Sequence, residues 1–364
     1  MHVLVCPTAF KETLTAAEAA AAMAAGAARA RPDARVTTLP LSDGGPGLLD
    51  ALRVTAGEIR RLPGAGPMGE PLAAATLWPS PDEVVLEAAS TCGLHLVPAD
   101  RRDPKRTATH GLGLLLAACA DAGARRAVVG LGGSGTVDGG AGLAAALGWR
   151  LLDTQERDLP PGGGALPRLA RLVPPPSPRP LPRVTALADV RSPLLGPDGA
   201  ARRFAPQKGA SPADVEFLER GLGSLAREFA RVAHAAQPGR APAPDPALEP
   251  GAGAAGGLGF GLVAFAGADL VDGAEWVLER TGFDAALARA DLVVTGEGAW
   301  DPTSDLGKIT ARVLERAAAA GVPAVLACGR IEGPVPEGVR AVDGGGRRLD
   351  GDGLARIVEA AVRP

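Results

Sequence analysis

Short runs of apolar residues alternate along the chain with longer segments rich in alanine and leucine. The apolar runs predict buried strands at residues 2–6, 35–41, 84–88, 127–131, 149–152, 184–188, 291–295 and 322–328. The intervening segments predict helices at 15–31, 109–121, 141–147, 212–236, 258–266, 274–280 and 309–320, with a last helix ending at 362. Because strands alternate with helices, the pattern indicates an α/β fold with mainly parallel sheets.

Local signals refine this pattern. Thr15-Ala-Ala-Glu18 is a capping box and predicts the start of the first long helix. Residues 59–78 alternate in polarity around Pro-Gly-Ala-Gly-Pro, which predicts a hairpin, whereas the proline-rich stretches 157–183 and 237–250 predict surface loops. At 364 residues the chain exceeds one typical domain of about 100–200 residues, so we expect two domains.

Composition and charge exclude several classes of partner. The net charge of −3 and the absence of a basic run argue against nucleic acid. The four cysteines are scattered, without zinc-type spacing, and predict reduced buried thiols. The N-terminal stretch lacks the features of a signal peptide, and the apolar run 251–268 opens with closely spaced glycines. We therefore expect a cytoplasmic protein with no membrane partner.

Ligands of parallel α/β sheets bind outside the carboxyl ends of the strands. That rule makes the loops near Pro7, Asp43, Gly132, Asp189 and Glu297 candidate walls of the site.

The most distinctive of these loops lies within residues 128–142, VVGLGGSGTVDGGAG. A strand, a glycine-rich loop and a helix together direct backbone N–H groups at an anion, usually a phosphate. Gly132, Gly133, Ser134, Gly135 and Asp138 are therefore candidate cofactor-binding residues, although a tight turn without a ligand remains an alternative.

The same stretch also satisfies the dinucleotide fingerprint. Gly130-Leu-Gly-Gly-Ser-Gly135 fits G-x-G-x-x-G, and Asp153 follows at about the distance of a ribose-binding acid. An NAD-linked oxidoreductase is thus a second hypothesis, weakened because residues 136–140 insert an acid and two more glycines where a helix should run.

Two further segments combine acids with cations. Asp189 at a strand end, with Arg191 and Lys208 downstream, could orient a hydroxyl and neutralise a transferring phosphoryl group. Surface salt bridges around a turn are the alternative.

The second segment follows a later strand and contains Gly296, Glu297, Asp301 and Lys308. Isolated acids among glycines suit Mg²⁺, which takes one or two carboxylates together with phosphate oxygens. A helix-capping turn is the alternative here.

Taken in order, these motifs resemble the type I glycerate kinases over nearly the whole chain. The matching stretches are PTAFKETLT (7–15), SDGGPG (42–47), residues 107–113, GLGGSGTVDGGAG (130–142), residues 188–210, GAGAAGGLGFGL (251–262) and VVTGEGAWDPTSDLGK (293–308). The resemblance implies transfer of phosphate from ATP, with Mg²⁺, to D-glycerate to give 2-phosphoglycerate.

The resemblance also implies an organisation of the chain. Residues 1–60 with 285–364 would form a discontinuous Rossmann-like domain, and 61–284 an inserted α/β domain that carries the glycine-rich loop. The active site would lie in the interdomain cleft. Alanine-rich helix surfaces fit both a core and the interface of a homodimer.

Roles for single residues follow from the resemblance and the chemistry together. We expect Asp189 to orient or deprotonate the glycerate hydroxyl, Lys208 and Arg191 to face the transferring phosphate or the substrate carboxylate, and Lys11 to hold that carboxylate. The loop from Gly132 to Gly135 would cradle phosphates, with Gly296 and Lys308 also at the nucleotide, and Asp43, Glu297 or Asp301 would meet Mg²⁺.

The chain departs from the family pattern inside these motifs. Thr8 and Ala9 replace an Asp-Ser pair, Pro46 and Leu48 replace a glutamate and a threonine, Val137 replaces an asparagine, and Ala299 and Thr303 replace an arginine and a glutamine. Altered specificity, or a paralogue that binds ligand without catalysis, therefore remains open beside the active kinase.

Overall fold

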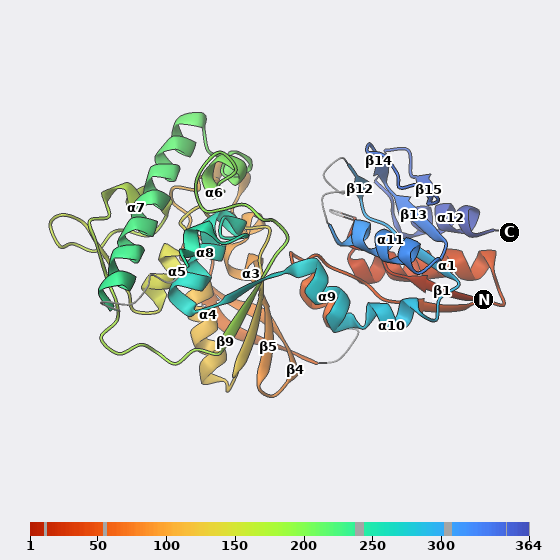
Figure 1. Cartoon of the computed structure of the whole chain (residues 1–364), viewed down its shortest axis with the longest axis horizontal. Coiled ribbons are helices and arrows are strands. Elements are labelled where there is room, and N and C mark those ends of the chain that lie inside the picture. The colour runs from red at the N-terminus through yellow and green to blue at the C-terminus, as the bar shows by residue number, and fades with distance from the viewer. Residues whose placement is uncertain (11–12, 54–56, 237–243, 302–307, 347, 364) are drawn as a thin grey trace. The chain divides into compact units, whose positions relative to one another are not determined.

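The computed structural model in Figure 1 describes residues 1–10, 13–53, 57–236, 244–301, 308–346 and 348–363. The chain forms two compact units: unit 1 combines Met1–Ala56 with Gly273–Pro364, and unit 2 is Gly57–Asp272. These boundaries differ from the expected 60/61 and 284/285. Residues 58–60 already belong to the first strand of the second sheet, and residues 273–284 fold with unit 1.

Unit 1 is built on a five-stranded, wholly parallel sheet in the order β15-β13-β11-β1-β2. Its strands are β1 (His2–Val5), β2 (Arg35–Thr38), β11 (Leu292–Thr295), β13 (Ala324–Cys328) and β15 (Arg340–Asp343), with a short pair β12 (Ala299–Trp300) and β14 (Arg330–Ile331). Its helices are α1 (Ala16–Ala30), α2 (Leu48–Arg53), α9 (Gly273–Thr281), α10 (Phe283–Leu287), α11 (Ile309–Ala319) and α12 (Gly351–Val362).

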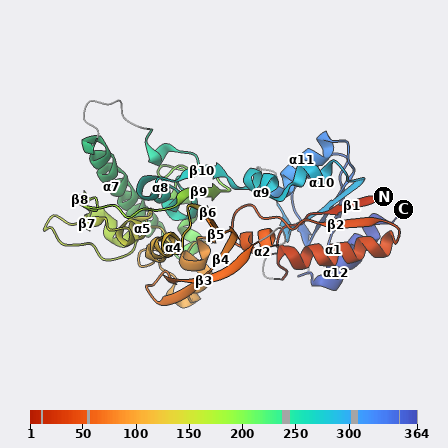
Figure 2. The same cartoon turned by 90° about the horizontal axis from the view of Figure 1, so that it is seen from below.

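Helices α1 and α12 lie side by side on one face of this sheet, with α11 on the other (Figure 2). Met23 of α1 and Leu354 and Val358 of α12 are fully buried against Val3 and Val294 of the central strands. The predicted capping box is confirmed: the Glu18 N–H donates to Thr15 Oγ1 (3.2 Å) and the Thr15 N–H donates to Glu18 Oε2 (2.8 Å).

Unit 2 is built on a six-stranded mixed sheet in the order β10-β9-β6-β5-β4-β3. Its strands are β3 (Glu58–Ala65), β4 (Pro71–Ser80), β5 (Glu83–Glu87), β6 (Arg126–Gly130), β9 (Arg183–Ala188) and β10 (Asp269–Asp272). Strands β5, β6, β9 and β10 run parallel, and β3 and β4 form the predicted antiparallel hairpin. Its helices are α3 (Ala89–Cys92), α4 (His110–Asp121), α5 (Ala141–Ala146), α6 (Ala200–Phe204), α7 (Pro212–Ala236) and α8 (Ala254–Ala266).

The prediction that 157–183 is only a loop was wrong. This stretch contains a 3₁₀ helix, η3 (Gly163–Arg168), and β8 (Arg171–Val173), which pairs antiparallel with β7 (Arg150–Leu152). The reason is that Leu166, Leu169 and Leu172 are buried in the core of unit 2, which orders the prolines around them. Prolines dominate the composition of the stretch, whereas three leucines decide its fold.

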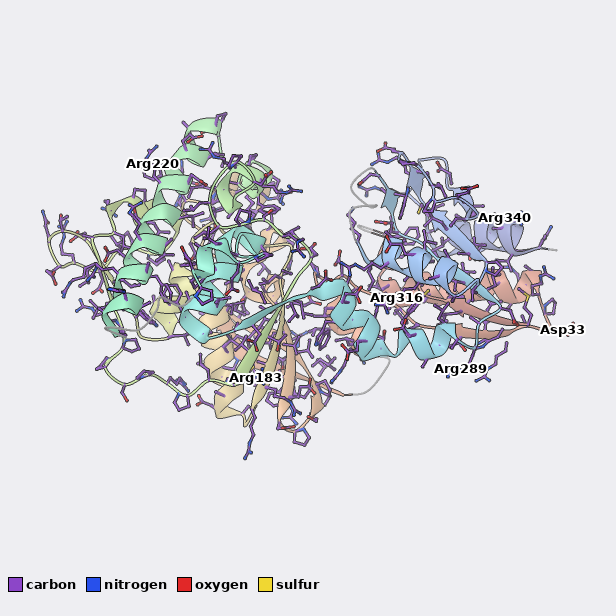
Figure 3. All side chains as sticks on the ribbon, viewed as in Figure 1. Asp33, Arg183, Arg220, Arg289, Arg316 and Arg340 are labelled. Carbon is purple, nitrogen blue, oxygen red and sulfur yellow. The ribbon has the colours of Figure 1, made fainter. Side chains whose placement is uncertain are left out.

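Surface charge is spread over many elements, and much of it is paired. Arg183, Arg220, Arg316 and Arg340 are among the charged side chains labelled in Figure 3. Arg183 lies 3.1 Å from Asp269, and Arg316 lies 2.8 Å from Asp284. Exposed pairs of this kind contribute little to stability, so each unit depends mainly on its apolar core. All four cysteines are buried free thiols, as expected, and burial raises the pKa of each to about 12.

Within the described ranges, none of the helices is long and apolar enough to cross a lipid bilayer.

Candidate active site

In unit 2 the candidate loops leave neighbouring strands at one edge of the sheet. Gly130, the last residue of β6, pairs with Leu187 of β9, and the Leu131 N–H donates to the Leu187 carbonyl (2.9 Å). The loop 131–140 and the segment from Asp189 onward therefore begin side by side at the carboxyl edge, where parallel sheets bind their ligands.

The glycine-rich loop is tied to its surroundings at several points. The Leu94 N–H donates to the Gly133 carbonyl (2.8 Å), the Gly135 N–H to the Cys92 carbonyl (2.7 Å), and Thr107 Oγ1 to the Gly135 carbonyl (2.7 Å). Gly133 is exposed and Gly132 half-buried, whereas Ser134 and Gly135 are buried. Only the first part of the predicted cradle is thus open to a ligand in this conformation.

Lys208 contacts the glycine-rich loop on its buried side. It ends the short 3₁₀ helix η4 (Pro206–Lys208), is only 2% exposed, and donates from Nζ to Ser134 Oγ (2.9 Å) and the Thr136 carbonyl (2.8 Å). Burial lowers the pKa of Lys208 to about 7, against the opposing charge of Asp138. These contacts make Lys208 a support of the loop in this conformation, and its expected place at the transferring phosphate or the substrate carboxylate stays a prediction.

Asp138 is likewise turned inward. The carboxylate is fully buried and accepts hydrogen bonds from the N–H groups of Thr109, Gly140 and Gly142 and from Thr109 Oγ1. It thereby satisfies backbone donors at the starts of α4 and α5, which have no partner within their own helices. Burial raises its pKa, and the four hydrogen bonds oppose that rise. Both carboxylate oxygens are occupied by the protein, so direct contact of Asp138 with a cofactor does not fit this geometry.

A second glycine-rich stretch packs against this loop. A Cβ on Gly140 would lie 2.5 Å from Gly261 Cα, and a Cβ on Gly256 would lie 1.9 Å from the Thr136 carbonyl oxygen. The backbone of Ala255 also takes a left-handed conformation (φ 53°), which is costly for a residue with a side chain. The GAGAAGGLGFGL motif therefore serves close backbone packing around the loop.

Asp189 and Arg191 lie just beyond the end of β9, and both are exposed. The segment that carries them is held by the Gly253 N–H, which donates to the Ser192 carbonyl (2.8 Å). Exposure at the carboxyl edge leaves both side chains accessible to a substrate.

In unit 1 the corresponding edge carries Glu297. Gly296 follows β11, and a Cβ there would lie 1.8 Å from the Ala327 carbonyl oxygen, so this glycine permits packing of the backbone against β13. Its own carbonyl accepts the Thr8 N–H (2.9 Å), which joins the loops after β1 and β11. Gly296 thus has a structural role at this edge, and its predicted contact with the nucleotide stays a prediction.

Glu297 is the most perturbed acid at this edge. Burial raises the pKa of its carboxyl to about 7; Asp301 and Asp43 raise it further, while Lys308 and a hydrogen bond with Thr310 lower it. Its Oε1 is buried and has no hydrogen-bond partner among the residues that the structure describes. An unsatisfied buried oxygen of this kind calls for a proton, a cation or a bound water.

The acids around Glu297 are oriented by the protein. Lys308 Nζ lies 3.8 Å from Asp301 Oδ1, and Asp43 Oδ1 accepts the Gly45 N–H (3.2 Å). No cluster of three or more potential metal ligands occurs in the part of the chain that the structure describes. The oxygen donors nevertheless fit Mg²⁺, which needs only one or two carboxylates besides phosphate and water.

The remaining residues singled out in the sequence are Lys11 and the positions that depart from the family pattern. Lys11 and Thr303 lie outside the described residues. Thr8 is half-buried beside Gly296, Pro46 is exposed, and Ala299 belongs to β12.

Sequence reasoning missed the residues that support the loops. Thr107 donates a hydrogen bond to the glycine-rich loop, and Thr109 donates one to Asp138. The Cys328 thiol is hydrogen-bonded to the backbone of Glu297. The threonines stand in the stretch 107–113 that contributed to the resemblance, whereas no sequence signal singles out Cys328.

The dinucleotide hypothesis does not fit the fold. Its acid, Asp153, follows β7, which pairs only with β8 among the described strands, in a separate small sheet. In a Rossmann unit that strand would lie beside β6. Asp153 instead accepts from the Gln155 and Arg157 N–H groups in a tight turn.

Two α/β units with glycine-rich and acidic loops at the carboxyl edges of their parallel strands are typical of enzymes that act on phosphorylated ligands. The glycerate kinase family model matches residues 3–343, and the chain belongs to that family.

Individual relatives agree. The chain is 40% identical to a glycerate kinase of Bacillus subtilis over 335 residues, which is 91% of this chain and 85% of that protein. It is 36% identical to the glycerate 2-kinase of Escherichia coli, over 85% and 80% of the two chains. The crystal structure of a putative glycerate kinase 2 from Salmonella typhimurium is similar with a TM-score of 0.82 and 35% identity, covering 100% of this chain and 96% of that one.

Proposed function

We propose that the protein transfers the γ-phosphate of ATP to the 2-hydroxyl of D-glycerate, with Mg²⁺, giving 2-phosphoglycerate. The observation that carries the proposal is the family match over residues 3–343, which includes every loop described above. The similarity to an enzyme named glycerate 2-kinase supports the choice of hydroxyl.

The glycine-rich loop is proposed to receive the phosphates of the donor. Phosphoryl transfer requires positioning and charge neutralisation more than covalent chemistry by the protein. The exposed Gly133 and the half-buried Gly132 let the backbone approach a phosphate closely, while Lys208 and Asp138 hold the loop from its buried side.

The acceptor is assigned to exposed groups. Asp189 would accept a hydrogen bond from the glycerate hydroxyl and take its proton as the phosphoryl group arrives. Arg191, two residues further on, offers a cation to the substrate carboxylate or the phosphate, and Lys11 is proposed for the carboxylate.

Glu297 and Asp301 are the residues that would hold Mg²⁺. Asp43 is a further candidate, because its charge acts on the pKa of Glu297. When bound, the ion would neutralise negative charge on the phosphates. Lys308, 3.8 Å from Asp301, would orient that carboxylate.

The test is release of ADP from Mg-ATP in a coupled assay, with D-glycerate, related hydroxy acids and no acceptor. We expect turnover that depends on D-glycerate and falls about 100-fold or more in Asp189→Asn, because general-base catalysis contributes about that much. The exposed Asp198→Asn is the matched control and should retain activity.

Turnover with a different acid only would show that changes such as Thr8 and Pro46 have altered the specificity. A folded protein that binds Mg-ATP without any turnover would overturn the kinase proposal in favour of a non-catalytic paralogue.

A further inference from the structure

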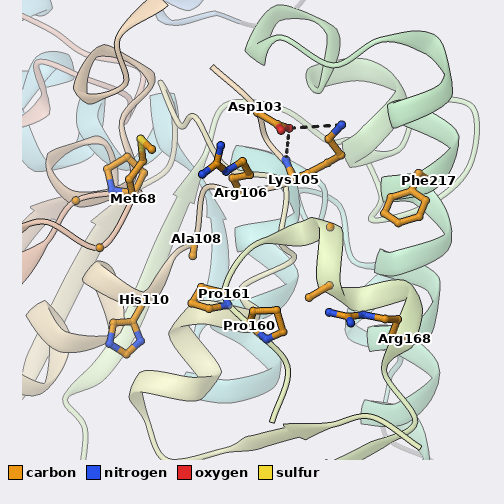
Figure 4. A pocket seen from close by; sticks show the side chains of 15 residues that line it. Met68, Asp103, Lys105, Arg106, Ala108, His110, Pro160, Pro161, Arg168 and Phe217 are labelled. Atoms are coloured by element: carbon orange, nitrogen blue, oxygen red, sulfur yellow. Dashed lines mark hydrogen bonds and ion pairs between the residues drawn. The ribbon is translucent and has the colours of Figure 1, made fainter. Parts of the chain in front are cut away.

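Unit 2 contains a cavity of about 580 Å³ that none of the loops above lines. It lies between the β3–β4 turn, residues 103–110, residues 160–168 and α7 (Figure 4). Arg106 and His110 lie on one side of it, and Arg168 and Phe217 on the other.

The lining of this cavity carries excess positive charge. Asp103 is its one acid, and it is balanced by Lys105, whose Nζ lies 3.9 Å from Asp103 and also donates to Asp214 (2.5 Å). Arg106 and Arg168 form no ion pair with any residue within the described ranges. Two guanidinium groups are therefore available to an anion, and arginine suits phosphate through its fork of donors.

The remaining walls are largely apolar. Met68, Pro160, Pro161 and Phe217 line the cavity, together with small residues. The volume falls within the range of about 300–1,000 Å³ for small-molecule sites, and a three-carbon acid would leave most of it empty. A ligand with both a flat ring and phosphate groups matches the walls and the charge together.

The cavity is connected to the glycine-rich loop through its own lining. Thr107, between the lining residues Arg106 and Ala108, donates from Oγ1 to the Gly135 carbonyl (2.7 Å). The Ala108 N–H in turn donates to the Pro67 carbonyl in the β3–β4 turn (2.8 Å). One short segment thus forms the wall of the cavity and also anchors the predicted phosphate loop.

We propose that this cavity binds the nucleoside part of the donor, with its base against Met68, Pro160 and Phe217 and the phosphates nearest the ribose on Arg106 and Arg168, so that the terminal phosphate is the one that the glycine-rich loop receives. This inference rests on the proposed function and assigns its donor a site in unit 2.

Isothermal titration of the full chain with ADP, without acceptor, tests the inference. Arg106→Gln combined with Arg168→Gln should raise the Kd for ADP roughly 100-fold, since each lost charge-assisted hydrogen bond is worth about a factor of ten. Arg125→Gln is the matched control: this exposed arginine precedes β6 at the opposite edge of the same sheet, and its loss should leave the Kd unchanged.

Arg168→Glu, checked by thermal unfolding, provides a second variant and should abolish ADP binding. Equal ADP affinity in wild type and the double variant would overturn the cavity site, and so would binding of 2-phosphoglycerate without ADP. The ADP-release assay separates the two proposals. If the wild-type enzyme is active and the double variant binds ADP normally, the nucleotide site in the cavity is refuted, whereas the proposed kinase activity is not.

Discussion

At the scale of single residues, two carboxyl groups of the candidate loops, the fully buried Asp138 and the half-buried Glu297, differ in how their oxygens are satisfied. Asp138 is satisfied by four hydrogen bonds, whereas one buried oxygen of Glu297 has no partner within the described part of the chain. A satisfied buried carboxylate stabilises its surroundings, and an unsatisfied one is available for a ligand.

Asp138→Asn is expected to destabilise unit 2 by about 3 kcal/mol or more, because an amide nitrogen would face backbone donors that need an acceptor. Chemical unfolding measures this change. Asp100→Asn, at an exposed aspartate of the same unit, is the control and should have no measurable effect. Equal stability of the two variants would contradict the assigned role.

Glu297 should make stability depend on pH. Folding raises the pKa of its carboxyl from 4.5 to about 7, so the folded state favours the protonated form. The contribution of this carboxyl to the free energy of unfolding is therefore fully present below pH 4.5 and is lost as the pH rises through 7. In metal-free buffer, Glu297→Gln should therefore gain up to about 3 kcal/mol over wild type between pH 4.5 and pH 8.

Denaturant titrations at several pH values give this difference, with the exposed Glu337→Gln as the control. A constant gap between wild type and Glu297→Gln over this range would show that the carboxyl is not perturbed.

At the scale of elements, the glycine-rich loop after β6 and the glycine-rich stretch at the start of α8 are in direct backbone contact. Gly140 and Gly261 approach so closely that neither tolerates a side chain. The loop after β6 is thus positioned by α8 as well as by Lys208 and Thr107.

Gly140→Ala should cost about 3 kcal/mol or more in unfolding free energy, because a left-handed φ of 78° and a backbone overlap act together. Gly123→Ala is the matched control, with φ 97° and nothing within 4 Å of the new Cβ, and should cost only about 1 kcal/mol. Thermal unfolding compares them, and equal costs would refute the packing argument.

At the scale of the whole molecule, the two units differ in how the chain builds them. Unit 2 is continuous and has its own core, whereas the central strands β1 and β11 of unit 1 come from opposite ends of the chain. Unit 1 is therefore complete only when both ends are present.

A fragment of residues 57–272 is expected to fold alone with a cooperative thermal transition by circular dichroism. A fragment of residues 1–56 should remain unfolded, because it keeps only β1 and β2 of a five-stranded sheet. A non-cooperative transition of 57–272 would mean that unit 2 depends on unit 1.

The sequence by itself determined the local features of this protein. The α/β class, the hairpin, the capping box at Thr15 and the bounds of α7 all follow from periodicity and end signals that act over a few residues. The order of the motifs was also sufficient to place the chain in its family.

Only the tertiary structure decided which side chains of those motifs face inward. In the sequence Lys208 looks like a ligand of phosphate and Asp138 like a cofactor-binding residue, yet the fold buries both. Lys208 donates to the Thr136 carbonyl and Asp138 accepts the Thr109 N–H, and both of these partners are distant in sequence. The cavity beside Arg106 likewise depends on segments that are distant in sequence. The same holds for the pairing of β7 with β8, which the buried leucines stabilise. Burial and hydrogen bonding are properties of long-range packing, and a local pattern of residue types does not contain them.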